Sequence, residues 1–304
     1  MSFLRTGGGF DRMAIFPPGM VWIASYPKSG NTWLRILLAN IVAETDTPED
    51  INKLSLDEDL AGSRELFERQ TLVDSSLLHP DEIDGMRPGA LDAYAASRDR
   101  ATFLKAHDSW TRLPDGSPAL GTAARAALYI VRDPRDVAVS FAFHQSIPID
   151  RAIEHMNETS SFFGPSDYQV RQRTNGWSGH VRSWLDDSGL SLCLIRYEDL
   201  HADTGKAFGK VLRFLGVCYE NEEVERKETL RAVRHSGFAG LQRQEREKGF
   251  AERSFRQASF FREGCVGAWR NHLKDAQVRS IETAHAATMA RLGYEPAIVQ
   301  EYAA

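Results

Sequence analysis

The stretch Ser25-Tyr26-Pro27-Lys28-Ser29-Gly30-Asn31-Thr32-Trp33 joins two segments of different hydrophobic period. The apolar run before it, residues 20–24, is rich in strand formers, and the leucines and isoleucine after it recur at helical spacing. This pattern predicts a strand, a tight turn and a helix. Such a turn offers a lysine ammonium, small hydroxyls, a glycine and the positive end of a helix dipole, which together favour binding of an anion such as phosphate.

The turn matches a nucleotide-binding P-loop only in part. The usual pattern G-x-x-x-x-G-K-[ST] places the lysine after the second glycine, whereas Lys28 precedes Gly30 by two residues. The simplest alternative is a turn that Pro27 and Gly30 merely shape, with Lys28 in solvent. The choice between these interpretations depends on the residues that follow the other strands.

Composition limits the class of protein. The chain has 304 residues, 42% hydrophobic and 26% charged, which predicts a soluble globular protein with a sizeable core. The net charge of −5 and the pI near 6.0 argue against broad nucleic-acid binding. No apolar run reaches the roughly 18 residues of a membrane helix, and residues 1–10 lack the apolar segment of a secretion signal. We expect a cytoplasmic protein that binds neither nucleic acid nor membrane.

Cysteine and histidine patterns give no sign of a metal site or a disulfide framework. Cys193, Cys218 and Cys265 are odd in number and widely spaced, as reduced thiols are. The chain contains no Cys-x-x-Cys pair and no His-Glu-x-x-His helix motif. We therefore expect no bound metal.

Three further apolar runs, residues 101–104, 126–131 and 190–195, have the composition of strands buried on both faces of a parallel sheet. Helical patterns alternate with or follow them, at residues 135–145, 176–185, 206–214, 222–233 and 275–290. The alternation predicts a single α/β domain over residues 1–304, with a central, largely parallel β-sheet flanked by helices.

Polar side chains follow each predicted strand. Lys105 and His107 follow the second run, Arg132 follows the third and Tyr197 follows the fourth. Asp133 is a suitable N-cap for the helix that begins with Pro134. Because ligands of open α/β sheets bind at the carboxyl ends of the strands, these side chains and the opening turn are expected to share one site.

Five motifs in this order resemble the signature of the cytosolic-type sulfotransferases, over residues 21–269. They are Ser25 to Trp33, Lys105-Ala106-His107, Arg132-Asp133-Pro134-Arg135-Asp136 with Ser140, Tyr197-Glu198-Asp199-Leu200, and Arg262-Glu263-Gly264 with Gly267 and Trp269. That family transfers a sulfonate from 3′-phosphoadenosine 5′-phosphosulfate (PAPS) to a hydroxyl and releases 3′-phosphoadenosine 5′-phosphate (PAP). The resemblance implies this activity on a P-loop-like fold, with a small or medium-sized organic acceptor and no metal.

The resemblance also implies roles for individual residues. His107 corresponds to the general base, Lys105 to the lysine that touches the transferring sulfonate, and Lys28 to the residue that assists the leaving phosphate. The implied donor-binding residues are Lys28, Ser29, Gly30, Asn31, Thr32, Trp33, Arg132, Ser140, Tyr197, Ser236, Phe238, Arg262, Glu263 and Gly264.

Within this set the implied contacts differ. The turn after the first strand would hold the 5′-phosphosulfate through Lys28 and the backbone of residues 29–32. The aromatic residues Trp33, Tyr197 and Phe238, with Ser236, would contact adenine. The 3′-phosphate would be bound by Arg132, Ser140, Arg262 and the Gly264 amide. Glu263 stands where the family often has a second basic residue.

The chemistry of these residue types suits sulfonate transfer. A neutral His107 can take the proton of an attacking hydroxyl, and Lys28 with the turn amides can stabilise a leaving phosphate. The planar fork of arginine binds two phosphate oxygens at once. The alternative to phosphate binding for Arg132 is a simple ion pair with Asp136.

The resemblance implies a division of the chain around the site. Residues 1–18 would be a flexible leader, residues 44–100 and 141–175 would build the acceptor pocket, and residues 238–269 would form a loop over the 3′-phosphate. The expected pocket walls are Phe141, Phe143, His144, Phe162 and Phe163.

The sequence departs from the family at several positions. Asn31 and Ala106 stand where threonine is frequent in the animal enzymes, and Ala268 where aspartate is frequent. Residues 270–276 do not reproduce the family's dimerisation motif. The oligomeric state is therefore open, and a homodimer is one of the possibilities. Two other functions stay open from the residues alone: a P-loop kinase and a non-catalytic nucleotide-binding protein.

Overall fold

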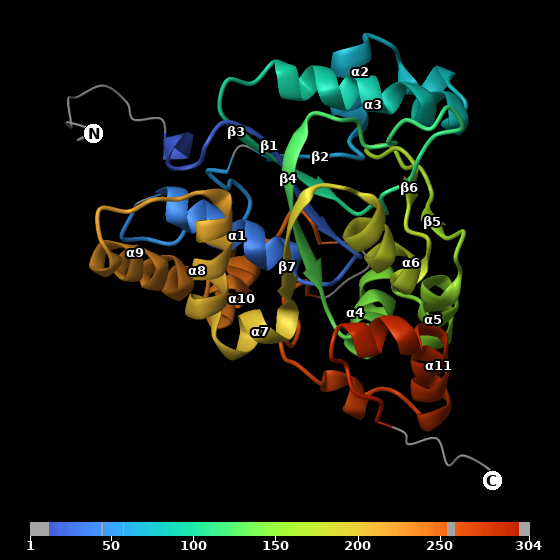
Figure 1. Cartoon of the computed structure of the whole chain (residues 1–304). Coiled ribbons are helices and arrows are strands. Elements are labelled where there is room, and N and C mark those ends of the chain that lie inside the picture. Colours follow the sequence, from blue (N-terminus) through green and yellow to red (C-terminus); the bar gives the residue numbers. More distant parts are fainter. Residues whose placement is uncertain (1–11, 44, 57, 254–258, 298–304) are drawn as a thin grey trace.

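The computed structural model describes residues 12–43, 45–56, 58–253 and 259–297. Its centre is a five-stranded sheet in which every pairing is parallel (Figure 1). Across the sheet the strands are β2 (Glu58–Leu60), β3 (Ala101–Ala106), β1 (Gly19–Ser25), β4 (Ala124–Val131) and β7 (Ser191–Arg196). The predicted α/β fold with a central parallel sheet is confirmed.

Four of the five strands coincide with the predicted apolar runs, and β2 was missed. It contains only Glu58, Asp59 and Leu60, so it has neither the length nor the apolar composition of a buried strand. It lies at the edge of the sheet and pairs only with β3. An edge position tolerates charged residues, which is why no hydrophobic pattern marks it.

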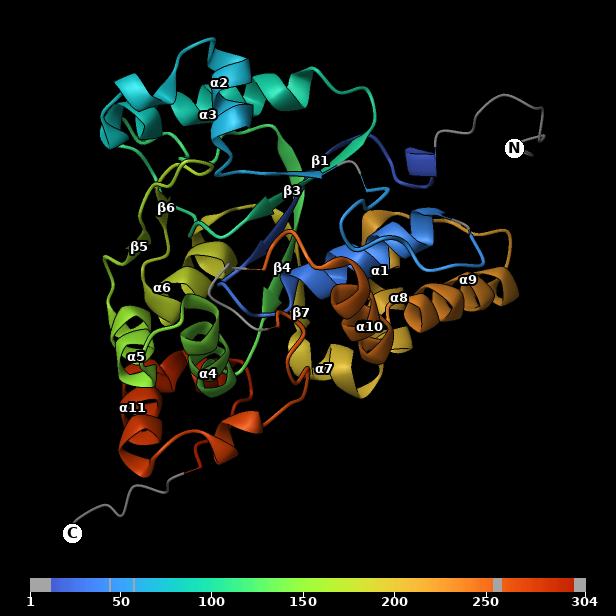
Figure 2. The same cartoon turned by 180° about the vertical axis from the view of Figure 1, so that it is seen from behind.

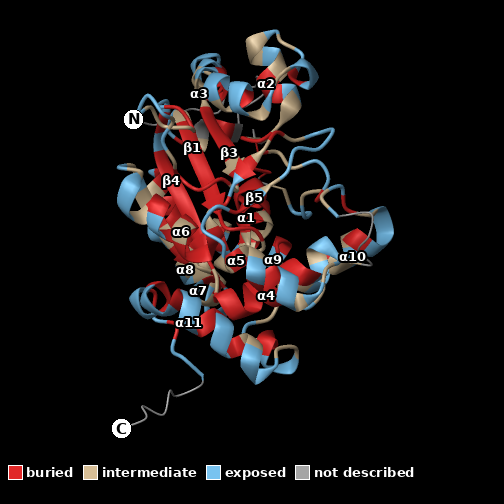
Figure 3. Cartoon of the chain, turned by 90° about the vertical axis from the view of Figure 1, so that its right-hand side faces the viewer, coloured by how far each residue is buried: buried red, intermediate tan, exposed pale blue. Residues whose placement is uncertain are grey.

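Helices cover both faces of the sheet (Figures 1 and 2). On one face lie α1 (Asn31–Ala43), α8 (Thr204–Leu215) and α9 (Glu222–His235), and on the other lie α4 (Pro134–Gln145), α5 (Ile149–Asn157), α6 (Gly176–Arg182) and α11 (Asp275–Arg291). Successive side chains of β1 point to opposite faces of the sheet. Val21 and Ile23 pack with α1, and Trp22 and Ala24 pack with the helices on the other face. The three central strands β3, β1 and β4 are consequently buried along most of their length (Figure 3).

The start of α4 follows the prediction. The Asp133 side chain accepts a hydrogen bond from the Arg135 backbone amide, and Pro134 occupies the first turn. A proline is favourable there because its missing N–H would have no helical partner. This cap fixes the path of the chain immediately after Arg132, at the carboxyl end of β4.

The segment between β2 and β3 is largely helical. It contains α2 (Arg64–Thr71), a 3₁₀ turn at Ser75–Leu77 and the 17-residue helix α3 (Pro80–Ala96). The helix begins with a capping box formed by His79 and Glu82 and continues through Pro88. Beside it lies a two-stranded antiparallel hairpin of β5 (Phe162–Phe163) and β6 (Gln172–Arg173).

The C-terminal third differs in one respect from the expectation of a loop over residues 238–269. The segment begins with helix α10 (Phe238–Lys248), because Leu241 and Glu245 turn toward the interior at helical spacing. Residues 254–258 of this segment lie outside the described residues. The remaining elements are α7 (Tyr197–Ala202), a π-helical turn at Ser183–Asp187 and 3₁₀ turns at Arg12–Ile15 and Ala268–Asn271.

The described part of the expected flexible leader of residues 1–18 contains packed side chains. Met13 and Phe16 are buried, and Phe16 packs edge to face on Phe103 of β3. Residues 1–11 lie outside the described residues. None of the helices in the described ranges has the length and hydrophobicity that crossing a bilayer requires.

Candidate active site

A cavity of about 960 Å³ lies at the carboxyl ends of the central strands. From β1 the chain continues to β2 and β3 on one side of the sheet, and from β4 it continues to β7 on the other side. The strand order therefore reverses between β1 and β4, and a crevice is expected at the carboxyl ends of these two strands. Fourteen sequence-predicted site residues line this cavity: Lys28, Gly30, Asn31, Thr32, Trp33, Lys105, His107, Arg132, Ser140, Tyr197, Phe238, Arg262, Glu263 and Gly264.

Ser29 and Ser236 are the two predicted site residues that do not line the cavity, and both are fully buried. The Ser236 hydroxyl accepts a hydrogen bond from Asn40, and its backbone carbonyl accepts one from the Trp33 indole at 3.1 Å. Ser236 was expected to contact adenine directly, but in the structure it binds and orients the Trp33 side chain instead. The Ser29 hydroxyl has no hydrogen-bond partner among the described residues.

Two of the five expected acceptor walls, His144 and Phe163, line the cavity. Phe141 is buried behind Phe163, with their ring centroids 5.6 Å apart. Phe143 and Phe162 are exposed and lie outside the cavity lining. The wall assignment of Phe141, Phe143 and Phe162 is therefore wrong, because consecutive helical or strand residues cannot all face one side.

The turn between β1 and α1 has an unusual backbone. Lys28 has φ = 68° and Gly30 has φ = 108°, and α1 begins at Asn31. A Cβ on Gly30 would lie 2.7 Å from the Tyr197 ring, so only glycine fits. The Asn31 side chain points inward and donates to the Ile23 carbonyl at 2.9 Å. The turn therefore presents the first backbone amides of α1 to the cavity, an arrangement that binds anions.

The Lys28 ammonium is buried beside other cations. Burial, with the charges of Lys105 and Arg132, lowers the pKa of Lys28 to about 7, and Glu252 opposes the shift. Its Nζ lies 3.9 Å from the centroid of the Phe260 ring. A bound anion would stabilise the charged form of this lysine.

His107 is held in one tautomer by the neighbouring strand. Its Nδ1 lies 2.9 Å from the backbone carbonyl oxygen of Ser25, which can only accept, so Nδ1 carries the proton. Burial and the charge of Lys105 lower the pKa of His107 to about 3. The imidazole is therefore neutral near pH 7, and the lone pair lies on Nε2.

A second buried histidine supports the backbone at His107. The Tyr129 hydroxyl lies 2.8 Å from His180 Nδ1, and His180 Nε2 lies 3.3 Å from the His107 carbonyl oxygen. Since the carbonyl only accepts, His180 Nε2–H donates to it and Tyr129 donates to Nδ1. Burial lowers the pKa of His180 to about 3, so this relay stays neutral.

Lys105 is paired with a residue that the sequence analysis missed. Its Nζ lies 2.8 Å from Glu252 Oε2, and Arg35 lies 2.5 Å from Glu252 Oε1. Glu252 belongs to a polar stretch rich in arginine and glutamate, where no periodicity distinguishes one carboxylate from another. Only the fold brings it next to Lys105, which is 147 residues away in the sequence.

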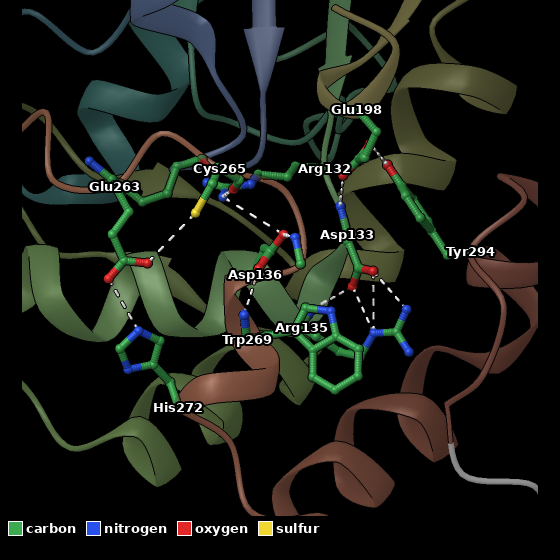
Figure 4. A network of polar contacts seen from close by, with 12 residues as sticks. Arg132, Asp133, Arg135, Asp136, Glu198, Glu263, Cys265, Trp269, His272 and Tyr294 are labelled. Carbon is green, nitrogen blue, oxygen red and sulfur yellow. Dashed lines mark hydrogen bonds and ion pairs between the residues drawn. The ribbon is translucent and has the colours of Figure 1, made fainter. Parts of the chain in front are cut away.

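Arg132 connects the turn between β1 and α1 to the C-terminal segment, and Figure 4 shows it beside Cys265 and Asp136. Its guanidinium donates to the Cys265 carbonyl at 3.0 Å and to the Lys28 carbonyl at 3.4 Å. It also lies 4.4 Å from the centroid of the Tyr197 ring and 3.8 Å from Asp136. The ion pair with Asp136 is therefore present together with contacts that hold Arg132 at the cavity.

Asp136 fastens the loop that carries Arg262. Its carboxylate accepts hydrogen bonds from the backbone amides of Gly267 at 2.7 Å and Trp269 at 2.9 Å (Figure 4). This places residues 262–264 at the cavity opposite Trp33 and Tyr197, whose ring centroids are 5.7 Å apart.

Glu263 contacts two side chains near this loop, those of Arg262 and His272. It forms an ion pair with Arg262 and lies 3.2 Å from His272 Nε2. The Arg262 guanidinium rests 3.9 Å from the centroid of the Phe143 ring. Gly264 has φ = 61°, and a Cβ there would lie 2.3 Å from the Phe238 ring. Backbone at Gly264 therefore packs directly on an aromatic residue of the cavity.

The described residues contain no group of three or more His, Cys, Asp or Glu side chains that could hold a metal ion. The charged groups that face the cavity are instead lysines and arginines with a smaller number of carboxylates.

Comparison with known proteins places the chain in a family. The sulfotransferase domain model matches residues 18–293. Human Sulfotransferase 4A1 is 26% identical over 228 residues, covering 72% of this chain and 68% of the relative. Cytosolic sulfotransferase 17 of Arabidopsis thaliana is 24% identical over 279 residues, covering 87% of this chain and 72% of the relative.

Solved structures share the fold. Mouse sulfotransferase SULT7A1 complexed with PAP has a TM-score of 0.57 at 19% identity, over 90% of this chain and 85% of that one. Retinol dehydratase in complex with androsterone and inactive cofactor PAP has a TM-score of 0.58 at 19% identity, over 90% and 81%. Because the family model matches nearly the whole chain, the chain belongs to the sulfotransferase domain family and is a transferase.

Proposed function

We propose that this protein transfers a sulfonate group from PAPS to a hydroxyl of a small or medium-sized organic acceptor, with PAP as the second product. The observation that carries the proposal is the shared cavity of a neutral His107 and the ammonium groups of Lys28 and Lys105 at the carboxyl ends of β1 and β3. A base and cations at one point are what displacement by a hydroxyl needs.

The residues present fit a donor with two phosphate-containing ends. At one end, the turn offers the buried Ser29 hydroxyl, the backbone that Gly30 leaves open, and Lys28. At the other end, Arg132 and Arg262 supply guanidinium groups, and Ser140 supplies a hydroxyl. Trp33, Tyr197 and Phe238 provide aromatic surface between these ends, as an adenine ring requires.

Each reacting group has a distinct task. The donor would supply a sulfonate activated by its bond to a phosphate. His107 Nε2 would take the proton of the acceptor hydroxyl, while the Ser25 carbonyl holds Nδ1–H and keeps the ring oriented. Lys28 and the amides at the start of α1 would stabilise the charge that develops on the leaving phosphate. Lys105 would bind the sulfonate during transfer.

The acceptor is expected beside the aromatic residues of the cavity. His144, Phe163, Tyr168 and Phe260 line the cavity and offer aromatic surface. Such a lining suits an organic alcohol or phenol with an apolar body. Androsterone and retinol, which occupy solved relatives of this fold, are molecules of that kind. From the printed name of its Arabidopsis relative we further propose a cytosolic location.

The alternatives from the sequence are tested together with the proposal. A kinase with a P-loop would need lysine and serine or threonine directly after the glycine, an order that the turn lacks. Incubation with ³⁵S-labelled PAPS, EDTA and a panel of phenols and alcohols should label an acceptor. Transfer that occurs only with added Mg²⁺, or PAP binding without transfer to any acceptor, would contradict the proposal.

A further inference from the structure

A carboxylate lies in the donor part of the cavity. The Glu252 oxygens lie 2.8 Å from Lys105 Nζ, 2.5 Å from Arg35 and 3.4 Å from the Thr32 hydroxyl. One of these partners, Lys105, is the group that the proposed function assigns to the donor's sulfonate, and Thr32 belongs to the turn whose backbone would hold the phosphosulfate. Glu252 therefore contacts a group that an incoming anion would use.

Glu252 is held in place from both sides. Arg35 comes from the buried face of α1 and is only 8% exposed. The backbone just before Glu252 is fixed by Asn52, which accepts from the Ala251 amide at 2.7 Å and donates to the Gly249 carbonyl at 3.1 Å. Phe250 is buried between them in the sequence. The carboxylate is thus a built feature of the cavity and not a chance surface contact.

The carboxylate is charged at neutral pH. Burial opposes its ionisation, but the neighbouring Lys105 and Arg35 hold the pKa of the Glu252 carboxyl well below its usual range. An ionised carboxylate repels another anion within a few ångströms, and this repulsion is strong where water is largely excluded. A sulfonate at Lys105 would meet that repulsion, and it would also share or replace one of the ammonium's hydrogen bonds.

We propose that Glu252 is a specificity-determining residue of the donor site, whose carboxylate competes with the donor's sulfonate for Lys105. The inference rests on the proposed function, since it takes PAPS and PAP as the ligands. PAP lacks the sulfonate, so Glu252 can keep Lys105 when PAP is bound. The carboxylate consequently penalises PAPS and leaves PAP nearly unaffected, because only a differential contact changes relative affinity.

The Glu252 carboxylate also offsets part of the positive charge of the cavity. Lys28, Lys105, Arg35 and Arg132 all carry or share positive charge near one another, and Glu252 is the carboxylate that bridges two of them. Once sulfonate has left with the acceptor, the same carboxylate can bind Lys105 again. Glu252 thereby holds Lys105 at the cavity in the states that lack a sulfonate.

The test compares the affinities of PAPS and PAP by calorimetry, without acceptor, in the full chain. In Glu252→Gln the Kd of PAPS should fall by about tenfold, as removal of one nearby like charge predicts, and the Kd of PAP should change by less than about twofold. The matched control is Glu247→Gln on the exposed face of α10, which removes the same charge away from the cavity and should leave both values unchanged.

Three results for Glu252→Gln would overturn the inference. One is an equal change in the Kd values of PAPS and PAP, and another is no change in either. The third is weaker binding of PAPS, which would mean that the carboxylate positions Lys105 for the donor. The effect should vanish in a Lys105→Ala background, and its persistence there would also contradict competition for Lys105. If Glu252→Gln does not fold, Glu252→Ala, which also removes the charge, should shift the ratio in the same direction. Failure of the proposed function is distinguishable, since the unaltered chain would then either bind neither PAPS nor PAP or bind them without transferring sulfonate to any acceptor.

Discussion

His107 donates its Nδ1 proton to the backbone carbonyl oxygen of Ser25 at a distance of 2.9 Å. Ser25 is the last residue of β1, and His107 directly follows the neighbouring parallel strand β3. This bond fixes the tautomer, so Nε2 is the atom with a free lone pair. The same two strand ends carry Lys105 and the turn that contains Lys28, so the register of one strand pair sets the geometry between His107 and the two lysines.

Replacement of His107 by asparagine should separate chemistry from binding. Asparagine retains an N–H for the Ser25 carbonyl but has no group that takes a proton near neutral pH. We expect kcat to fall by about 10²- to 10⁴-fold and the Kd of PAP to change by less than about threefold. Steady-state kinetics and calorimetry measure the two quantities. A variant with near-normal kcat would remove His107 from the mechanism.

The lowered pKa of Lys28 predicts that PAP binding weakens as pH rises above about 7. A phosphate partner raises the pKa of this lysine, so the complex holds more protons than the free protein between the two pKa values. The Kd should increase by up to tenfold per pH unit between pH 7.5 and 8.5, with uptake of up to one proton. Calorimetry in buffers of different ionisation enthalpy measures this uptake.

Lys28→Arg is the control for that pH dependence. Arginine stays protonated throughout this range, so the slope should disappear even if the affinity itself changes. A Kd of the unaltered protein that is the same at pH 7 and pH 8.5 would show that the Lys28 proton is not linked to binding.

Gly264→Ala should disturb the loop of residues 262–264, which we propose binds the 3′-phosphate. A methyl group at this position would lie 2.3 Å from the Phe238 ring, and φ = 61° disfavours any residue with a Cβ. We expect more than about 1 kcal/mol of destabilisation and weaker PAP binding. The control is Gly240→Ala within α10, where nothing lies within 4 Å of an added Cβ. Equal effects of the two substitutions on PAP affinity would contradict the assigned packing.

Arg262→Ala should reduce recognition of the 3′-phosphate. Removal of a guanidinium from a phosphate site costs about 1.5–3 kcal/mol, so the Kd of PAP should rise by at least about tenfold. The Kd of adenosine 5′-phosphosulfate, which lacks a 3′-phosphate, should change little. Arg243→Ala on the exposed face of α10 is a control for overall charge. Unchanged discrimination between the two nucleotides would argue against this role of Arg262.

The buried pair of Arg87 and Asp108 should dominate the stability of the region beside His107. Arg87 of α3 binds Asp108 through two hydrogen bonds, at 3.0 and 2.6 Å, and also donates to the Ala61 carbonyl. Arg87→Met leaves a buried carboxylate unpaired and should lower the free energy of unfolding by about 3–5 kcal/mol. Adding Asp108→Asn should recover part of this loss in urea unfolding, and no recovery would contradict the pairing argument.

Local sequence signals predicted four of the five strands, and the family resemblance predicted fourteen of the residues that line the cavity. The apolar runs of β1, β3, β4 and β7 are long enough to indicate strands, and Asp133 with Pro134 marks the start of α4 by backbone chemistry alone. His107 and Arg132 directly follow such a strand, and Lys28 lies in the turn after one. A residue's position at the end of a strand depends on the nearby sequence alone, so it can be predicted from the sequence.

The contacts made by Glu252 and Arg35 could not be predicted. They join residues 217 positions apart, and each side chain has the same local appearance as many other charged residues of the chain. The assignments of Ser236 and Phe143 failed for a related reason. A motif locates a residue along the chain, whereas packing decides which way its side chain points, and here Ser236 faces Asn40.

The most direct test of the proposed reaction follows both products at once. The full chain is incubated with ³⁵S-labelled PAPS, EDTA and a phenol or alcohol, and the labelled acceptor and PAP are quantified over time. The proposed function predicts equal amounts of both products in the unaltered protein and a rate at least about 10²-fold lower in His107→Asn. PAP release without a labelled acceptor across the panel, or equal rates in both proteins, would contradict it.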